Sequence, residues 1–374
     1  MDRQLRRIRR QRALQRQRFA VALTVLSALV AVTLIGCRST TPANRLAQAS
    51  KAKAKPAPHV PWRPPQFVVV SFDGSGGVRL WPYWRSVAHR AHAHFTFFVS
   101  GVYLLDEARR NRYRPPRHSP GSSDIGFAQA EGKRSAQQMV RGMHDQIVAA
   151  YREGHEIGTH FNGHFCAPYA GNVGEWTAAD WRRELREFFK LLFGGPDRLP
   201  FHPAEVIGGR TPCLQGNFRA LYPVLALSGF RYDASQVARL GTWPKRERGL
   251  WTMPLVEIPF VGHTYDVVSM DYNFMANQAD AAPDAIERET FLTLRHAFLE
   301  SYYGNRAPLS IGVHFETWRS WAYDHAVTRL LEGVCRLREV RCVSYRELVG
   351  WLDAQSPRLL RRARSGRFPH LKRP

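Results

Sequence analysis

A short apolar segment followed by a helical one recurs about seven times along this chain, and that alternation restricts its fold more than any other feature. The predicted strands lie at residues 67–72, 95–100, just before His160, at 205–209, from Phe230, at 256–259, at 309–314 and at 341–343. Strands that alternate with helices favour a parallel sheet. The pattern therefore predicts an α/β fold, a closed or nearly closed (β/α) barrel of about seven parallel strands over residues 67–352.

Polar residues stand where several of these strands end. They are Asp73, His160, Arg210, Asp233 and His314, and more than 200 positions separate the first from the last. The carboxyl ends of parallel strands in a barrel gather on one face, where active sites are built. We therefore expect these five side chains to approach one another.

His160 and His164 are the candidate metal ligands. They lie in Gly154–His164, which reads G-H-E-I-G-T-H-F-N-G-H and follows a helical pattern that ends at Gly154. Two imidazoles four positions apart bind one cation if the intervening residues form a helical turn or a tight loop. On spacing alone, two ordinary surface or half-buried histidines are the alternative.

The amino-terminal segment has the layout of an export signal. Eight arginines occur in the first 18 residues, and an uncharged apolar run follows from Phe19 to Ile35. The run ends in Leu34-Ile35-Gly36-Cys37, which resembles a bacterial lipobox. We expect a signal peptide at 1–36, a lipidated Cys37 that begins a flexible tether at 37–66, and a protein held on the outer face of the cytoplasmic membrane or in the cell envelope. An uncleaved membrane anchor is the alternative.

Charge indicates an anionic partner. The formal net charge is +23, and residues 358–374 contain seven basic residues and no acidic one. Outside the cell, the polyanions are envelope polymers and lipid headgroups rather than nucleic acid. We expect residues 353–374 to form a basic, mobile tail.

Apart from Cys37, the chain has four cysteines, at positions 166, 213, 335 and 342. An oxidising compartment permits disulfides, and four cysteines allow three pairings. A Cys335–Cys342 bridge would attach a helix to the sheet, and a Cys166–Cys213 bridge would brace the histidine motif. Free buried thiols are the alternative.

Taken in order, the motifs resemble those of the polysaccharide deacetylase family, the NodB-homology carbohydrate esterases (family 4), over about residues 67–352. The matching segments are Ser71-Phe72-Asp73-Gly74, Thr96-Phe97-Phe98-Val99, His160 to His164, Arg210-Thr211-Pro212, Tyr232-Asp233 and Leu309 to His314. Each motif is loose by itself, and the ordered set is specific.

The resemblance implies a distorted (β/α) barrel and metal-dependent hydrolysis of acetyl groups on a sugar polymer. It implies that His160 and His164 bind a divalent ion, with Zn²⁺ expected, and that Asp73 is the catalytic base oriented by Arg210. His314 takes the position of the acid, and Asp233 that of the buried acid that keeps this imidazole charged.

Gly74 departs from the family pattern. The family has a second aspartate here, which is normally the third metal ligand, and glycine has no side chain to coordinate an ion. Three outcomes are open. Asp73 moves onto the metal, a distant carboxylate completes the shell (Asp124, Asp271 or Glu316), or the site has lost metal and catalysis.

Two functions therefore compete, a metal-dependent deacetylase of an envelope or extracellular polysaccharide and a non-catalytic carbohydrate-binding or scaffold lipoprotein. A third carboxylate near His160 and His164 favours the first, and its absence favours the second. Trp81, Trp84 and Trp318 are candidate sugar platforms. A serine hydrolase is disfavoured because the chain has no G-x-S-x-G motif.

Overall fold

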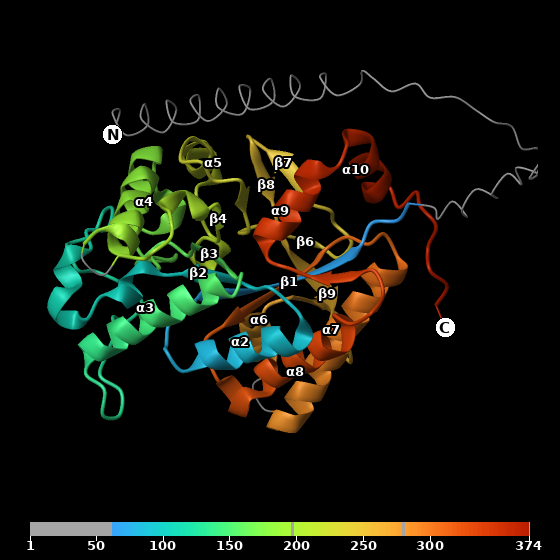
Figure 1. The fold of residues 1–374 in the computed structure, drawn as a ribbon, viewed down its shortest axis with the longest axis horizontal. Coiled ribbons are helices and arrows are strands. Elements are labelled where there is room, and N and C mark those ends of the chain that lie inside the picture. The colour runs from blue at the N-terminus through green and yellow to red at the C-terminus, as the bar shows by residue number, and fades with distance from the viewer. Residues whose placement is uncertain (1–61, 196–197, 279–280, 374) are drawn as a thin grey trace, which may run out of the picture. The chain divides into compact units, whose positions relative to one another are not determined.

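The computed structural model describes residues 62–373, apart from residues 196–197 and 279–280 (Figure 1). Its main sheet has nine strands among these described residues. In spatial order they are β11 (Leu309–His314), β1 (Gln66–Gly74), β2 (Thr96–Val99), β3 (Glu156–Thr159), β4 (Gly208–Gly209), β5 (Tyr232–Asp233), β8 (Leu250–Thr252) and β7 (Lys245–Glu247), while β12 (Val340–Cys342) pairs with β1. All neighbours are parallel except β7 and β8. The predicted mostly parallel α/β fold is confirmed.

A smaller sheet connects the two ends of this curled sheet. It contains β10 (Asp266–Val268), β9 (Leu255–Pro259) and β6 (Val237–Arg239), and β9 follows β8 almost directly in the chain. On its other side, the Gly312 N–H of β11 donates to the Ser269 carbonyl at 2.9 Å. The sheet is therefore an incomplete barrel that this smaller sheet helps to close.

Helices cover the outside of the barrel, with α2, α7 and α8 below β1 and α4, α5 and α9 above it in the view of Figure 1. The helices are α2 (Leu80–Ala91), α3 (Ala136–Arg152), α4 (Ala178–Phe193), α5 (Phe218–Leu227), α6 (Asp271–Asn277), α7 (Pro283–Tyr303), α8 (Trp318–Val334), α9 (Tyr345–Ala354) and α10 (Pro357–Arg364). Capping boxes at Thr177 and Ser344 begin α4 and α9.

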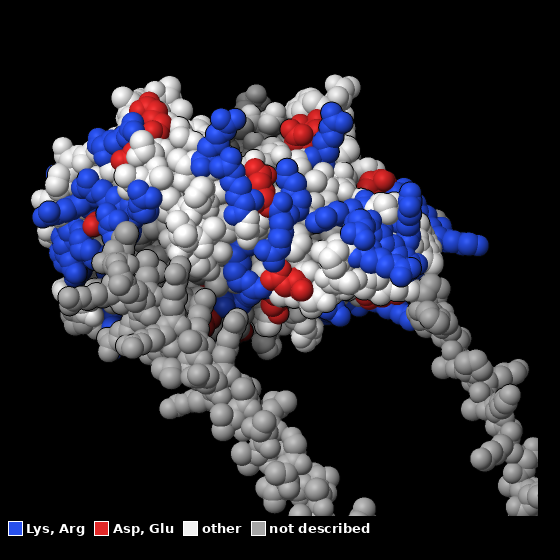
Figure 2. Space-filling view, turned by 90° about the horizontal axis from the view of Figure 1, so that it is seen from above, with Lys and Arg blue, Asp and Glu red and all other residues white. Residues whose placement is uncertain are grey.

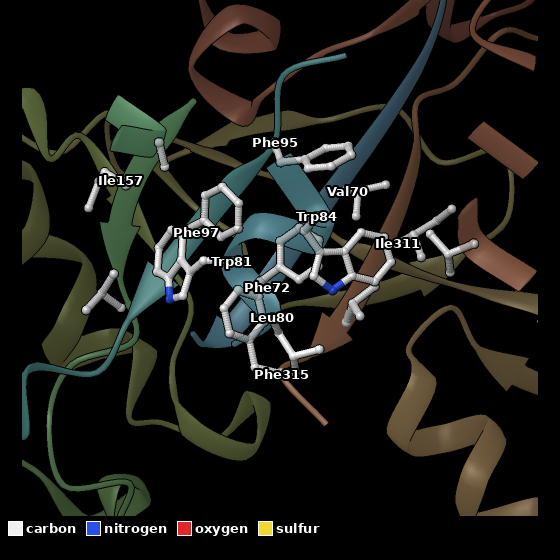
Figure 3. Packing of buried hydrophobic residues seen from close by; sticks show 14 of the residues in the cluster. Val70, Phe72, Leu80, Trp81, Trp84, Phe95, Phe97, Ile157, Ile311 and Phe315 are labelled. Carbon is white, nitrogen blue, oxygen red and sulfur yellow. The ribbon is translucent and has the colours of Figure 1, made fainter. Parts of the chain in front are cut away.

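Aromatic residues fill the core between β1, β2 and α2 (Figure 3). Phe72 stacks on Phe97 with ring centroids 4.9 Å apart, and Trp81 stacks on Phe97 at 4.3 Å. Trp81 and Trp84 are both 0% exposed. The prediction that these two tryptophans are exposed sugar platforms is therefore wrong, because α2 turns them inward onto the strands.

The predicted mobile tail is also wrong for the part of it that the structure describes. Residues 353–354 end α9, and α10 follows with Ala363 and Phe368 buried. Arg364 donates to the Pro244 carbonyl at 2.8 Å. Apolar residues spaced among the arginines attach this segment to the barrel and leave its charges outside.

The predicted signal peptide, Cys37 and nearly all of the tether lie outside the described residues. Among those described, no helix is both long enough and apolar enough to span a membrane.

Candidate active site

Strand register places Asp73 beside His314. Asp73 lies near the carboxyl end of β1, His314 ends β11, and the two residues are direct partners in the parallel pairing. His160 directly follows β3, and Arg210 directly follows β4. The Arg210 N–H donates to the Thr159 carbonyl at 3.0 Å, which ties these two strand ends together. One rim of the barrel thus carries all four residues, as predicted.

Asp73 and Arg210 form a buried ion pair. The Arg210 Nη1 lies 2.7 Å from Asp73 Oδ1, and the side chains are 0% and 4% exposed. Burial alone would raise the pKa of the Asp73 carboxyl, but the positive charges of Arg210 and His314 and the hydrogen bond from Arg210 hold this pKa below its ordinary value. Asp73 is therefore a carboxylate at neutral pH.

The Arg210 guanidinium is fixed on all sides. It donates to the Ala234 carbonyl at 2.8 Å, to Ser71 Oγ at 2.9 Å and to Tyr345 Oη at 3.1 Å. Its carbon also lies 5.0 Å from the centroid of the Phe98 ring. Because each of its three nitrogens has a partner, Arg210 holds Asp73 in one orientation.

His160 presents an unprotonated nitrogen to the site. Its Nδ1 lies 3.0 Å from the Arg210 carbonyl, which can only accept, so Nδ1 carries the proton and Nε2 keeps its lone pair. Burial lowers the pKa of His160 to about 3 and also lowers the pKa of His164. The two rings are 5.2 Å apart. Two neutral, adjacent imidazoles suit a metal ion.

The loop between these histidines is tightly constrained. Phe161 and His164 both have left-handed backbone, with φ of 60° and 58°. The Thr159 hydroxyl accepts from the Phe161 N–H at 2.8 Å, and the Asn162 amide donates to the Glu184 carbonyl at 3.1 Å. Such conformations persist only where the surroundings over-determine them, and they cluster at functional sites.

Asp271, not Asp233, orients His314. Asp271 begins α6, and its carboxylate accepts from both the His314 N–H (2.6 Å) and the His314 Nδ1 (2.7 Å). Burial opposes the charged imidazole, but the charge and hydrogen bond of Asp271 outweigh it and raise the pKa of His314 to about 9. His314 is therefore an imidazolium at neutral pH. The sequence analysis considered Asp271 only as a metal ligand, because its irregular segment gives no strand-end signal.

Asp233 has a different role from the one predicted. Its carboxylate accepts from the Ser235 hydroxyl at 2.6 Å and from the Tyr222 hydroxyl at 3.1 Å. The Ser235 oxygen in turn accepts from the Thr211 N–H at 2.8 Å. Asp233 thus supports the segment that follows Arg210, and the predicted contact with His314 is wrong because Asp271 occupies that position.

A tyrosine side chain occupies the space beside Gly74. A Cβ on Gly74 would lie 3.5 Å from Tyr103 Cε2 and 3.7 Å from both the Tyr103 hydroxyl and Ser100 Oγ. Gly76 makes further room, since a Cβ there would lie 2.6 Å from the same ring. Ser100 Oγ is buried and has no hydrogen-bond partner among the described residues. A phenol and an unpaired hydroxyl therefore border the position where a side chain on residue 74 would begin.

The residues present fit a three-ligand metal centre only in part. Among the described residues, no carboxylate completes a set with His160 and His164 whose ligand atoms all lie within 4.8 Å of one another. Asp271 binds His314 instead, while Asp124 and Glu316 are exposed. Asp73 is held by Arg210. Two imidazoles without a third protein ligand do not form the usual centre.

Two aromatic rings flank His314 at the rim. Trp318 and Tyr272 lie 5.5 and 6.3 Å from the His314 ring and 6.1 Å from each other. Tyr272 is 51% exposed and Trp318 is half-buried. Of the three tryptophans considered as platforms, only Trp318 lies at the site, and Tyr272 was not predicted.

Both of the disulfides considered are present. Cys166 is bonded to Cys213 and Cys335 to Cys342. The first joins the segment after His164 to the segment after Arg210, so it braces the site. The second joins the end of α8 to β12.

No protein-family model matches the sequence, and no curated protein matches it. Among solved structures, the chain is similar to a protein from Mycobacterium smegmatis described as a polysaccharide deacetylase, with a TM-score of 0.51 and 16% identity over 86% of this chain and 99% of that one. It is also similar to a chitin deacetylase from the fungal pathogen Colletotrichum lindemuthianum (TM-score 0.42, 12% identity, 79% and 90% of the two chains). A CE4-family pseudoenzyme from Bacillus anthracis is similar as well (TM-score 0.41, 11% identity, 79% and 70%). The chain has the fold of the polysaccharide deacetylases.

Proposed function

We propose that the protein is a hydrolase that removes acetyl groups from a polysaccharide. The observation that supports this function best is the pair of Asp73 and His314, which adjacent strands hold side by side in opposite charge states. The pKa of Asp73 lies below its ordinary value, and that of His314 is raised to about 9. Environments that push two pKa values apart in this way assign one group as base and the other as acid.

In the proposed reaction, Asp73 takes a proton from a water molecule that adds to the acetyl carbonyl carbon. His314 donates its proton to the sugar nitrogen or oxygen as its bond to that carbon breaks, and acetic acid leaves and ionises to acetate in solvent. Arg210 keeps Asp73 ionised, and Asp271 keeps His314 charged and oriented. Asp73 then gives its proton to solvent and His314 takes one up, which restores both groups.

No step is assigned to a metal, because no third protein ligand stands beside His160 and His164 in the part of the chain that the structure describes. Binding of Zn²⁺ by His160 and His164 remains a prediction, and metal analysis of the purified protein tests it. A divalent ion at that position would polarise the acetyl carbonyl.

A carbohydrate-binding protein without catalysis is the second candidate, and the replacement of the family's aspartate by Gly74 and Tyr103 favours it. In that case the rim of Trp318 and Tyr272 would still bind sugar, since aromatic faces provide apolar contact area beside polar groups.

Acetate release and oligosaccharide binding distinguish the two functions. The full chain is incubated with N-acetylated and O-acetylated oligosaccharides, with and without added Zn²⁺, beside D73N as a matched control. Acetate released by the wild type and not by D73N supports the hydrolase. Binding measured by calorimetry without acetate release under either condition supports the second candidate and overturns the first.

We place this activity outside the cytoplasm, on an envelope or extracellular polysaccharide, because the amino-terminal segment resembles a lipoprotein signal. The basic surface suits such a substrate if it is anionic. Figure 2 shows several groups of lysines and arginines on one face, with fewer acidic side chains among them. Cleavage at Cys37 and its lipidation are testable by mass spectrometry of the mature protein.

A further inference from the structure

Three side chains of the kinds that bind metal ions lie close together at the end of the loop from His160 to His164. The ligand atoms of His164, Cys166 and Cys213 all lie within 4.8 Å of one another, the one such trio among the residues that the structure describes. His164 Nδ1 lies 3.6 Å from Cys166 Sγ. In this structure the two sulfurs are bonded to each other, so they offer no thiolate to a metal.

The donor set suits a particular kind of metal ion. Two thiolates and one imidazole are a known zinc environment with three protein ligands and an open fourth position. Ligand atoms around one tetrahedral Zn²⁺ lie roughly 3.5 Å apart, so the trio needs small movements to bind one ion. Soft thiolates also favour zinc over magnesium or calcium.

The disulfide is accessible to a reductant. Cys213 is exposed, while Cys166 and His164 are half-buried. Cys213 has left-handed backbone, with φ of 53°, in the short helical turn Pro212–Leu214. A thiolate attacks a disulfide sulfur that it can reach, and exposure allows this.

We propose that reduction of the Cys166–Cys213 disulfide creates a Zn²⁺ site formed by the two thiolates and His164. A dithiol reductant supplies two electrons and two protons, the S–S bond breaks, and two thiols form while the dithiol becomes a disulfide. Binding of Zn²⁺ then releases both thiol protons. The site exists in the reduced protein and is absent from the oxidised one.

This site has a consequence for the candidate active site. The His164 ring lies 5.2 Å from the His160 ring, so a metal bound to the thiol pair would draw that imidazole away from His160. Under the proposed function, reduction would then act as a switch on hydrolysis. The metal site itself does not depend on that function.

Cobalt substitution tests the site directly. The full chain is titrated with Co²⁺ before and after reduction with a phosphine, which does not itself supply thiolates. We expect an intense near-ultraviolet thiolate-to-cobalt band in the reduced protein only. Oxidised protein that binds Co²⁺ through His160 and His164 would give no such band, so failure here is distinguishable from failure of the proposed function.

Two sets of variants complete the test. The band should be lost in C166S and C213S and retained in the matched control C335S/C342S, which removes the other disulfide. H164N should weaken binding and change the visible spectrum. Circular dichroism of each reduced protein checks that it is folded, and a folded reduced wild type without the band overturns the proposal. A band of equal strength in C166S or C213S overturns it as well.

Discussion

The two halves of the candidate active site differ in how completely their polar groups are paired. On the β1–β11 side, Asp73, Arg210, His314 and Asp271 form hydrogen bonds in which each charge meets an opposite one. On the β2–β3 side, Ser100 Oγ is buried without a partner among the described residues, and the space beside Gly74 holds Tyr103. The first half, the acid–base half of the proposed reaction, has every charge paired, whereas the histidine half has no third candidate metal ligand among the described residues.

Removing the base should have the largest effect. Replacing Asp73 with Asn keeps the shape of the side chain but removes the proton acceptor, so acetate release should fall by about 10²- to 10⁴-fold. The matched control is D145N, whose carboxylate is 78% exposed on α3. Equal rates for D73N and the wild type would remove Asp73 from the reaction and with it the main support for the hydrolase.

Replacing Arg210, the ion-pair partner of Asp73, tests the acid–base half by its effect on the free energy of unfolding. R210M leaves the Asp73 carboxylate buried and unpaired, which should cost about 3–5 kcal/mol of unfolding free energy. The exposed Arg186 provides the control R186M, expected within about 0.5 kcal/mol of the wild type. Denaturant unfolding measures both, and D73N/R210M should recover part of the loss. A cost below about 1 kcal/mol for R210M would mean that the pair is not held in a dry site.

The alkaline limit of activity depends on Asp271. His314 donates a proton, so activity should be present below its pKa, which is raised to about 9, and lost above it. D271N removes the charge that raises this pKa and should move the alkaline limb toward the ordinary value of about 6.5. The acid limb belongs to Asp73, whose pKa is lowered, and should not move. D284N, at an exposed position on α7, is the control.

Stability should follow the same titration. A group whose pKa is raised on folding stabilises the protein fully below its unfolded pKa, and this contribution is lost as the pH rises through about 9. D271N should therefore flatten the decline in stability between about pH 6.5 and 9. An unchanged pH–rate profile together with unchanged stability would show that Asp271 does not control His314.

Sequence reasoning found the residues that regular structure positions. Asp73, His160, Arg210 and His314 each stand at the end of a strand, and parallel strands bring such positions to one rim. Asp271 was not assigned its role because it lies at the start of α6, after a strand of the smaller sheet. The sequence there has no helical or strand periodicity that would predict which way its side chain points. Tyr103 was missed altogether, because only tertiary packing against Gly74 and Gly76 reveals it. The prediction of a mobile tail at residues 353–374 relied on its many basic residues and took no account of Ala363 and Phe368, whose side chains are buried.

The smallest effect that we expect is on Zn²⁺ affinity in the histidine half. It tests directly whether that half differs from the acid–base half by one missing metal ligand. Asp is among the few residues that tolerate the left-handed backbone of Gly74, with φ of 74°. G74D alone should bind Zn²⁺ little better than the wild type, because its Cβ would already contact the Tyr103 ring at 3.5 Å, which leaves the carboxylate little room to turn toward the imidazoles. G74D/Y103A removes that ring and should bind Zn²⁺ at least about tenfold more tightly, since a third protein ligand joins the two imidazoles.

Calorimetric titration of the oxidised proteins with Zn²⁺ measures this, and Y103A alone is the control for the space that the ring leaves. A large gain in the double variant and a small one in each single variant would show that Gly74 and Tyr103 act as one unit. If G74D alone bound Zn²⁺ as tightly as the double variant, Tyr103 would not prevent a third ligand from binding. The histidine half would then lack only one carboxylate. If neither variant bound Zn²⁺, His160 and His164 would not be metal ligands. The histidine half would then not be a metal site that lacks one residue.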